Sequence, residues 1–293
     1  MIKSKVHNFI HFYDFQPIFS ELDYLQNQYA TATKSSLTKS NSSFYNEWLN
    51  YDRLFKYQVS IAEQKLNSLF PHLRQKKRLI DGLGTVIKSI TGNLDANDAA
   101  HYEEALSFLQ NNQNKIITKL NSDISLTGEV IENFNKTVSL LQQNQKLIAS
   151  KLDKISKNFA NLYDNFYVFI QIKNVLDQIS SSLNIIMQLI DDIENAVSFA
   201  KLGVLHHSII KFSELKSIIA NITKKYSEKN LIFTNENEFR RYYELIEVEA
   251  YYVKRRIVFI LHFPLIYPNQ FVHYHLYSIP TINNTIIIPQ ILI

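Results

Sequence analysis

The sequence predicts a mainly helical protein with a C-terminal antiparallel β region, which is an α+β fold. Its 293 residues contain only five glycines and six prolines, so few positions interrupt a helix. Apolar residues recur at helical spacing through the middle of the chain, and they alternate with polar residues toward the C-terminus. Because 46% of the residues are hydrophobic, the chain can bury a sizeable core.

Composition excludes several classes of function. The chain has no cysteine, which rules out disulfides, thiolate zinc sites and cysteine nucleophiles within it. The net charge of +4 comes from 31 basic and 27 acidic residues, an excess too mild to predict binding to nucleic acid. The sequence also offers no nucleophile–base arrangement and no metal-binding helix motif. We therefore predict neither an enzyme nor a protein that holds a cofactor or a metal ion.

Residues 1–73 alternate polar and aromatic positions and include a Ser/Thr/Asn-rich stretch at 31–43. That composition predicts a loop. Roughly helical spacing of apolar residues then predicts a helix from Phe44, which carries the only tryptophan, Trp48. Pro71 ends this helix, so the basic residues that follow lie in a loop.

A basic cluster, RQKKR at 74–78, stands directly before an apolar run that contains glycine. Exposed Lys and Arg side chains in a loop are typical of a site for a dibasic-type protease. The predicted cleavage residues are Arg74, Lys76, Lys77 and Arg78. Cleavage after the cluster would make Leu79 a new N-terminus.

The apolar run predicts a short helix with one apolar face, and its two glycines allow close packing. The residues of this segment are Leu79, Ile80, Gly82, Leu83, Gly84, Val86, Ile87 and Ile90. Such a face can insert at a bilayer interface or pack in a protein core, and the adjoining basic cluster favours the bilayer. The GxG at 82–84 does not predict a dinucleotide site, because no strand precedes it and no third glycine follows.

Mostly apolar residues then step by three and four, the spacing of a coiled-coil seam, first from Leu106 to Leu120 with Gln113 as a polar member. After an extra step at Ile124, a second series keeps one heptad register with Gln145 as its single polar member. These positions, here called the seam, are Ile131, Phe134, Val138, Leu141, Gln145, Ile148, Leu152, Ile155, Phe159, Leu162, Phe166 and Phe169. A third series runs from Leu176 to Val197 after a three-residue slip.

A continuous helix from Leu106 to Phe169 would be on the order of 95 Å long at 1.5 Å per residue. A compact bundle cannot cover such a helix, so it either oligomerises or folds back, and Gly128 is a plausible breakpoint. The core of an ordinary helical bundle is the alternative. We predict self-association, as a homotrimer, through the seam.

Beyond Gly203, a short helix is expected through Phe212 and Ile219. From about Phe239 the apolar period drops to two, which predicts a small antiparallel sheet that reaches the C-terminus.

We expect neither a secretory signal nor a membrane span in this sequence. The N-terminus lacks the sustained apolar core of a secretory signal. The most apolar stretch, 257–267, is broken by His262 and Pro264 and falls short of the ~20 residues of a membrane span.

Two histidine pairs and an acidic triplet are further candidate sites. Each histidine pair could bind a metal or sense pH, but neither has a third ligand nearby in the sequence, so surface or interface histidines are favoured. The acidic triplet lies on a predicted helix, where a solvated face is favoured. The residues are His206 and His207, His273 and His275, and Asp191, Asp192 and Glu194. Sequons for glycosylation begin at Asn41, Asn135, Asn221 and Asn283.

Several segments together resemble the envelope proteins of insect gypsy-type retroelements (errantiviruses), which are related to the baculovirus fusion protein. The most specific is GLGTVIKSITGNLDANDA at 82–99, which follows the basic cluster. Others are YYELIEVEAYY, IVFILHFPLIYP and HLYSIPTINNTIIIPQ, and the resemblance runs from roughly Phe44 to the end. It implies a class I viral fusion protein, cut by a furin-like protease and assembled as a trimer in a viral envelope or host membrane.

The resemblance also implies a domain organisation. Residues 1–78 would be the C-terminal part of a surface-subunit-like region, and 79–98 a fusion-peptide-like segment. Residues 99–200 would form heptad-repeat coiled-coil helices, 201–235 a helical connector, and 236–293 a β-rich region. Membrane lipid would be a partner through residues 79–94, and a host receptor would be another.

The chain departs from this family at a few points. Gln75 stands where furin prefers arginine, so we expect weak processing after Arg78. Family members also carry a signal peptide, a cysteine-rich region and a membrane anchor, so this sequence resembles a truncated envelope protein. The alternative is a cytosolic helical oligomerisation or interaction protein, captured from a retroelement envelope and without fusion activity.

Overall fold

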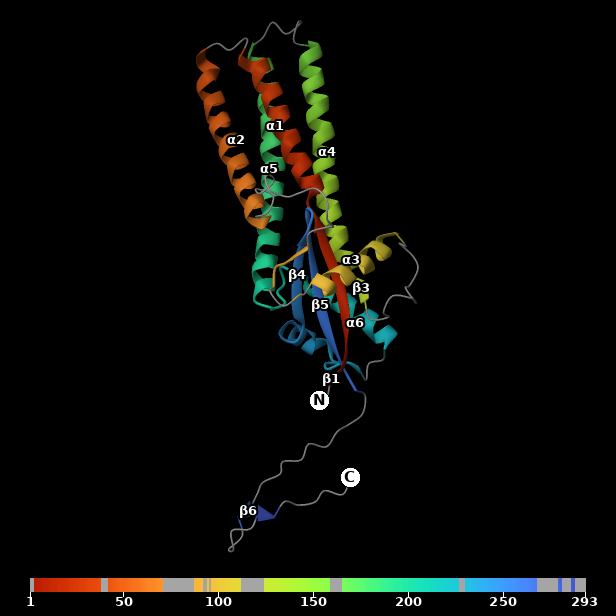
Figure 1. Cartoon of the computed structure of the whole chain (residues 1–293). Helices are drawn as coiled ribbons and strands as arrows, with labels where there is room; N and C mark the ends of the chain where they lie inside the picture. The colour runs from red at the N-terminus through yellow and green to blue at the C-terminus, as the bar shows by residue number, and fades with distance from the viewer. Residues whose placement is uncertain are drawn as a thin grey trace.

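The computed structural model describes residues 3–37, 42–70, 87–91, 94, 96–111, 124–158, 165–226, 230–267, 279–280 and 286–287. A long helical bundle stands on one end of a β-sheet, and shorter helices flank the sheet (Figure 1). The predicted α+β class is confirmed. The bundle helices are α1 (Gln16–Leu37), α2 (Ser42–Leu69), α4 (Gly128–Asn158) and α5 (Asn165–Lys201).

The sheet has the strand order β2-β4-β5-β1-β3. Its strands are β1 (Lys3–Asp14), β2 (Ile87–Ser89), β3 (Ile124–Leu126), β4 (Glu247–Val253) and β5 (Arg256–Ile266). The antiparallel hairpin of β4 and β5 confirms part of the predicted C-terminal sheet. The sheet is nevertheless mixed, because β1 from the N-terminus pairs along β5 and β3 runs parallel to β1.

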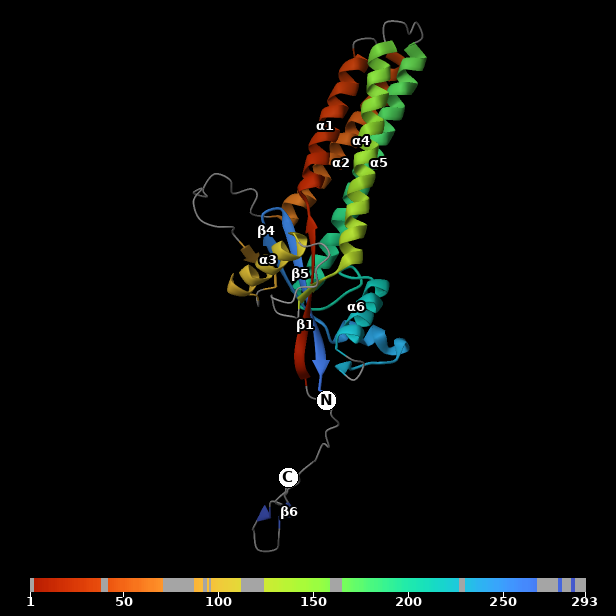
Figure 2. The ribbon, with the colours of Figure 1, turned by 90° about the vertical axis from the view of Figure 1, so that its right-hand side faces the viewer.

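Both faces of the sheet are covered, which explains the nearly continuous apolar sequence of β5. One face packs against the bundle and α6 (Phe212–Lys225), and the other against α3 (Ala96–Asn111). Figure 2 shows α3 and α6 on opposite sides of the sheet. Glu103 ties α3 to the hairpin, since its carboxylate accepts hydrogen bonds from Tyr251 Oη (3.0 Å) and Arg256 Nη2 (2.8 Å).

The remaining elements lie toward the C-terminus. A 3-10 helix, η3 (Glu236–Glu244), occupies part of the region where the sheet was expected to begin, so strand structure starts at Glu247. β6 (Ile279–Pro280) pairs with β7 (Ile286–Ile287). The predicted short helix after Gly203 is confirmed as α6.

The helices differ from the sequence-based expectation at 31–43 and narrow the alternatives for 106–169. The Ser/Thr-rich stretch at 31–43 is not all loop, because α1 continues to Leu37 and buries Ala32 against the bundle core. Packing of an apolar face outweighs the low helix propensity of serine and threonine. Of the two alternatives for 106–169, a continuous helix is excluded, since α3 ends at Asn111 and 124–126 is strand β3.

Gly128 begins α4, as the proposed breakpoint suggested, and the chain then reverses between α4 and α5. At the other end of α5, Gly203 adopts a left-handed conformation with φ 69°. Its N–H donates to Ala200 O (2.8 Å) and the N–H of Val204 donates to Phe199 O (3.2 Å), a Schellman motif that ends the helix. Directly after this turn, Val204 forms an antiparallel bridge with Glu247 at the start of β4.

Candidate functional site

The seam lies inside the bundle of a single chain. Every seventh residue from Phe134 is at most 5% exposed, and these residues are Phe134, Leu141, Ile148 and Ile155. Val138 and Leu152 are half-buried against the same core. The expectation that the seam is too long to bury within one subunit is therefore wrong for its described part, because α1 and α5 cover α4.

The ends of the seam are less fully described. Phe159 and Leu162 lie outside the described residues, and only the backbone of Phe166 is described. Phe169, within α5, is half-buried. In contrast, the third apolar series is buried throughout: Leu176, Ile179, Leu183, Ile186, Ile190, Ile193 and Val197 are each at most 5% exposed.

A layer of polar side chains crosses the bundle at mid-height. Asn144 Nδ2 on α4 donates to Ser182 Oγ on α5 (3.1 Å), and both residues are buried. On the other side of α5, Gln58 Nε2 of α2 donates to Asn184 Oδ1 (2.9 Å) and Ser180 Oγ donates to Gln58 Oε1 (3.1 Å). A satisfied polar layer of this kind fixes which residues face one another along the helices.

The acidic triplet of α5 divides between two environments. Asp191 forms an ion pair with Lys65 of α2, and Glu194 Oε2 lies 3.5 Å from the same ammonium. The hydrogen bond with Asp191 raises the pKa of Lys65. Asp192, in contrast, faces a pocket. Asp191 and Glu194 keep 49% and 42% of their side-chain surface exposed, so they lie on a solvated face as predicted and also join α5 to α2.

Most of the predicted cleavage and membrane-binding residues lie outside the described residues. These are Arg74, Lys76, Lys77, Arg78, Leu79, Ile80, Gly82, Leu83, Gly84 and Val86. At the end of that segment the predicted helix is wrong, because residues 87–89 form the edge strand β2, paired with β4. The N–H of Ile90 continues the pairing by donating to Ala250 O (2.8 Å).

β1 carries two buried histidines that sequence reasoning missed, because β1 was not recognised as a core strand. The ring nitrogens of His7 lie 2.8 Å from Tyr226 Oη and 2.9 Å from Ser125 Oγ. His11 is 0% exposed and stacks on Phe259 at 4.8 Å. Within the described part of the chain, neither ring nitrogen of His11 has a hydrogen-bond partner, and burial lowers its pKa to about 3.

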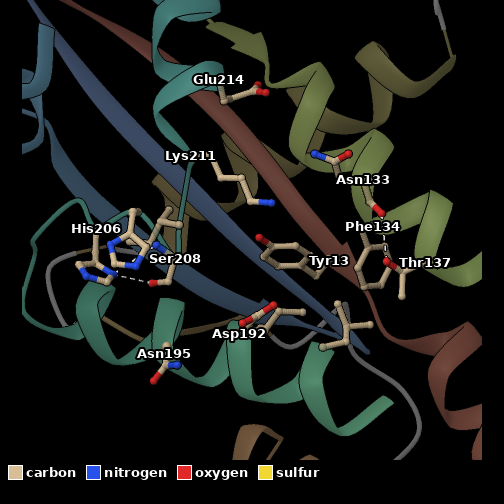
Figure 3. Close-up of a pocket in the computed structure, with 14 residues that line it drawn as sticks. Tyr13, Asn133, Phe134, Thr137, Asp192, Asn195, His206, Ser208, Lys211 and Glu214 are labelled. Atoms are coloured by element: carbon tan, nitrogen blue, oxygen red, sulfur yellow. Dashed lines mark hydrogen bonds between the residues drawn. The ribbon is translucent and has the colours of Figure 1, made fainter. Parts of the chain in front are cut away.

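A pocket of about 330 Å³ opens between the start of α4, the last third of α5, the turn at 206–209 and the start of α6 (Figure 3). Tyr13 and Phe134 supply aromatic wall, with their ring centroids 5.5 Å apart. Asp192 and Lys211 bring opposite charges to the same cavity. Burial, followed by the charges of Asp192 and Glu214, raises the pKa of Tyr13.

The turn that forms one wall of this pocket is held by His206. Its ring stacks on Phe199 at 3.6 Å, and its Nδ1 accepts a hydrogen bond from the N–H of Ser208 (3.2 Å). Burial and the neighbouring His207 lower the pKa of His206. His207 is exposed, as expected for a surface histidine, whereas His206 is half-buried.

The other candidate sites can be placed only in part. His273, His275, Asn41 and Asn283 lie outside the described residues, whereas Asn135 and Asn221 are exposed on α4 and α6. In the described ranges, no group of three or more His, Cys, Asp or Glu side chains could hold a metal ion. Nor does any helix in those ranges combine the length and apolar character needed to cross a bilayer.

Fold and site together define an elongated α+β protein whose main feature is a helical bundle with a buried heptad seam. The family model of the baculovirus F protein matches residues 3–291. The chain therefore belongs to the baculovirus F protein family, a family of viral envelope fusion proteins rather than enzymes. No curated protein and no solved structure matches the chain.

Proposed function

We propose that the chain is the ectodomain portion of a class I fusion protein of the insect gypsy-type retroelements, folded in a compact state that precedes fusion. The observation that carries this proposal is the seam. Its positions keep one heptad register from α4 into α5, although the chain reverses between these helices. A single straight helix would align the same residues along one stripe, which three copies could share.

Refolding in this scheme exchanges one set of apolar contacts for another. Each buried Leu or Ile contributes roughly 1.5–3 kcal/mol to the state that buries it. Because Leu141 and Ile148 are already buried in the compact bundle, only the difference between the two states can drive fusion. The covering helix α1 must therefore leave α4 before a trimer can form.

Residues 79–94 are proposed to bind lipid after cleavage at Arg78. The pairing of Ile87 with Val253 supports a tether that fixes the end of this segment to the sheet in the compact state. β2 is only three residues long, so few backbone hydrogen bonds oppose its release.

The alternative, a cytosolic interaction protein, would need the heptads as an open partner-binding surface. Burial of Phe134, Leu141 and Ile148 in the bundle favours the fusion proposal over that alternative.

Cross-linking α4 to α5 tests the proposal, and the absence of native cysteines makes the experiment specific. Asn144→Cys and Ser182→Cys place thiols at a pair of side chains now in hydrogen-bond contact. The chain would be expressed with an added signal peptide and a grafted C-terminal transmembrane helix, then treated with a short bifunctional thiol reagent. We expect cell–cell fusion to be lost in the double variant and retained in either single variant after the same treatment. Undiminished fusion by fully cross-linked protein would overturn the proposal.

A further inference from the structure

The pocket beneath the bundle combines charges that sequence reasoning did not bring together. Lys211, at the start of α6, and Asp192, on α5, both line it, and both side chains are exposed to solvent. In Figure 3, Lys211 extends toward Tyr13 from one side and Asp192 lies on the other. Within the part of the chain that the structure describes, neither side chain forms an ion pair or a hydrogen bond with a protein group.

Opposite charges facing one cavity restrict what can bind there. A simple cation placed beside Asp192 would be repelled by Lys211, and a simple anion beside Lys211 would be repelled by Asp192 and the buried Glu214. A zwitterion satisfies both groups at once. The aromatic rings of Tyr13 and Phe134 add a surface that favours an ammonium group over other cations.

The dimensions agree with a small ligand. The pocket volume of about 330 Å³ lies at the lower end of the 300–1,000 Å³ range typical of ligand sites. Its turn is fixed by the hydrogen bond from Ser208 N to His206 Nδ1 and by Tyr243 Oη, which donates to Ile210 O (2.9 Å). These two hydrogen bonds hold the wall of the cavity in place.

We propose that this pocket binds a small zwitterion, with its ammonium group against Asp192 and the aromatic wall and its phosphate or carboxylate against Lys211. Free zwitterions and phospholipid headgroups share this chemistry. The inference does not depend on the fusion proposal, because binding is measured on the folded chain in solution.

Calorimetry with phosphocholine tests the site, and choline and inorganic phosphate serve as probes that carry one charged group each. We expect phosphocholine to bind at least about tenfold more tightly than either probe, since a hydrogen bond to a charged group is worth about 1.5–3 kcal/mol. Lys211→Gln and Asp192→Asn should each weaken phosphocholine binding by about tenfold or more. Because both side chains are exposed, neither change should alter the unfolding temperature.

Two control variants remove the same charges at exposed positions outside the pocket. Lys224→Gln on α6 and Asp153→Asn on α4 should leave phosphocholine binding unchanged. A second arm uses sedimentation with phosphatidylcholine vesicles. Binding of free phosphocholine without vesicles identifies a soluble zwitterion, and binding of both, lost in both pocket variants, identifies a lipid headgroup. Absence of phosphocholine binding, equal affinity for choline, or equal weakening by the control variants would overturn the proposal.

Discussion

His11 is the residue whose environment gives the clearest dependence on pH. Its folded-state pKa of about 3 lies below the ordinary value of 6.5, because the ring is fully buried between Tyr13 and Phe259. Between those pH values the unfolded chain binds a proton that the folded chain does not. Stability contributed by this residue is therefore complete above pH 6.5 and is lost as the pH falls.

We expect the free energy of unfolding to drop by about 2 kcal/mol through His11 alone between pH 7.5 and pH 5. His11→Phe should remove this part of the drop, since phenylalanine does not titrate. Urea unfolding of both proteins at the two pH values measures it, with His207→Phe, at an exposed position, as the control. An unchanged drop in the His11 variant would show that protonation there does not limit stability.

Glu21 makes stability depend on pH in the opposite direction to His11. This α1 side chain is 4% exposed, and burial raises its pKa from 4.5 to about 7. The folded chain thus keeps a proton that the unfolded chain loses above pH 4.5, so stability falls as the pH rises through this window.

Glu21→Gln, which is neutral at every pH, should raise the free energy of unfolding at pH 8 by up to about 3 kcal/mol and change it little at pH 4. Glu63→Gln, at an exposed position on α2, is the matched control for urea unfolding. A gain of the same size at both pH values would mean that the effect comes from packing and not from charge.

At the scale of elements, adjacent leucines on α4 separate the inner and outer faces of the bundle. Leu141 is 1% exposed, whereas Leu140 is 46% exposed. Leu141→Ala should lower the free energy of unfolding by about 2–5 kcal/mol, because it leaves a cavity in the core. Leu140→Ala should cost less than about 1 kcal/mol. Equal losses in urea unfolding would contradict the burial of the seam within one chain.

Local periodicity predicts a helix that has one continuous apolar face, and it predicts two strands that pair when they are neighbours in the sequence. The apolar face of α5 from Leu176 to Val197 and the β4–β5 hairpin could be predicted from spacing alone, whereas the break at Gly128 was suggested by the length of the helix and the glycine itself. The reversal between α4 and α5 could not, because the heptad register continues across it and a register does not record direction.

The sequence pattern also could not predict which distant segments pair with each other. β1 and β5 are separated by about 250 residues in the sequence, as the pair Asn8↔His262 shows. No local feature of either strand identifies the strand with which it pairs. The pocket draws side chains from five parts of the chain, so Tyr13, Asp192 and Lys211 meet only after the whole molecule has folded. The polar layer at Asn144 lies beside the seam, one position away from the glutamine that the pattern identified.

At the scale of the whole molecule, processing after Arg78 is expected to be slow, because Gln75 stands where furin prefers arginine. Gln75→Arg should accelerate cutting of the secreted protein by furin, and Arg78→Ala should abolish it. Gel analysis of a digestion time course measures both rates. Complete and equally fast cutting of the natural sequence and the Gln75 variant would show that the remaining basic residues suffice.

The position of β1 in the sheet has a consequence for a molecule cut at that site. β1, α1 and α2 precede Arg78, whereas β4, β5, α4 and α5 follow it, yet β1 is hydrogen-bonded to β5 from Lys3↔Ile266 to Asp14↔Arg256. With no cysteine in these 293 residues, a cleaved molecule would be a split protein whose halves complement each other non-covalently. The two fragments, expressed as separate polypeptides, should reassemble and elute together. The smaller fragment would then act as a removable part, and its departure would separate β3 from β5 and uncover α4 and α5 in a single step.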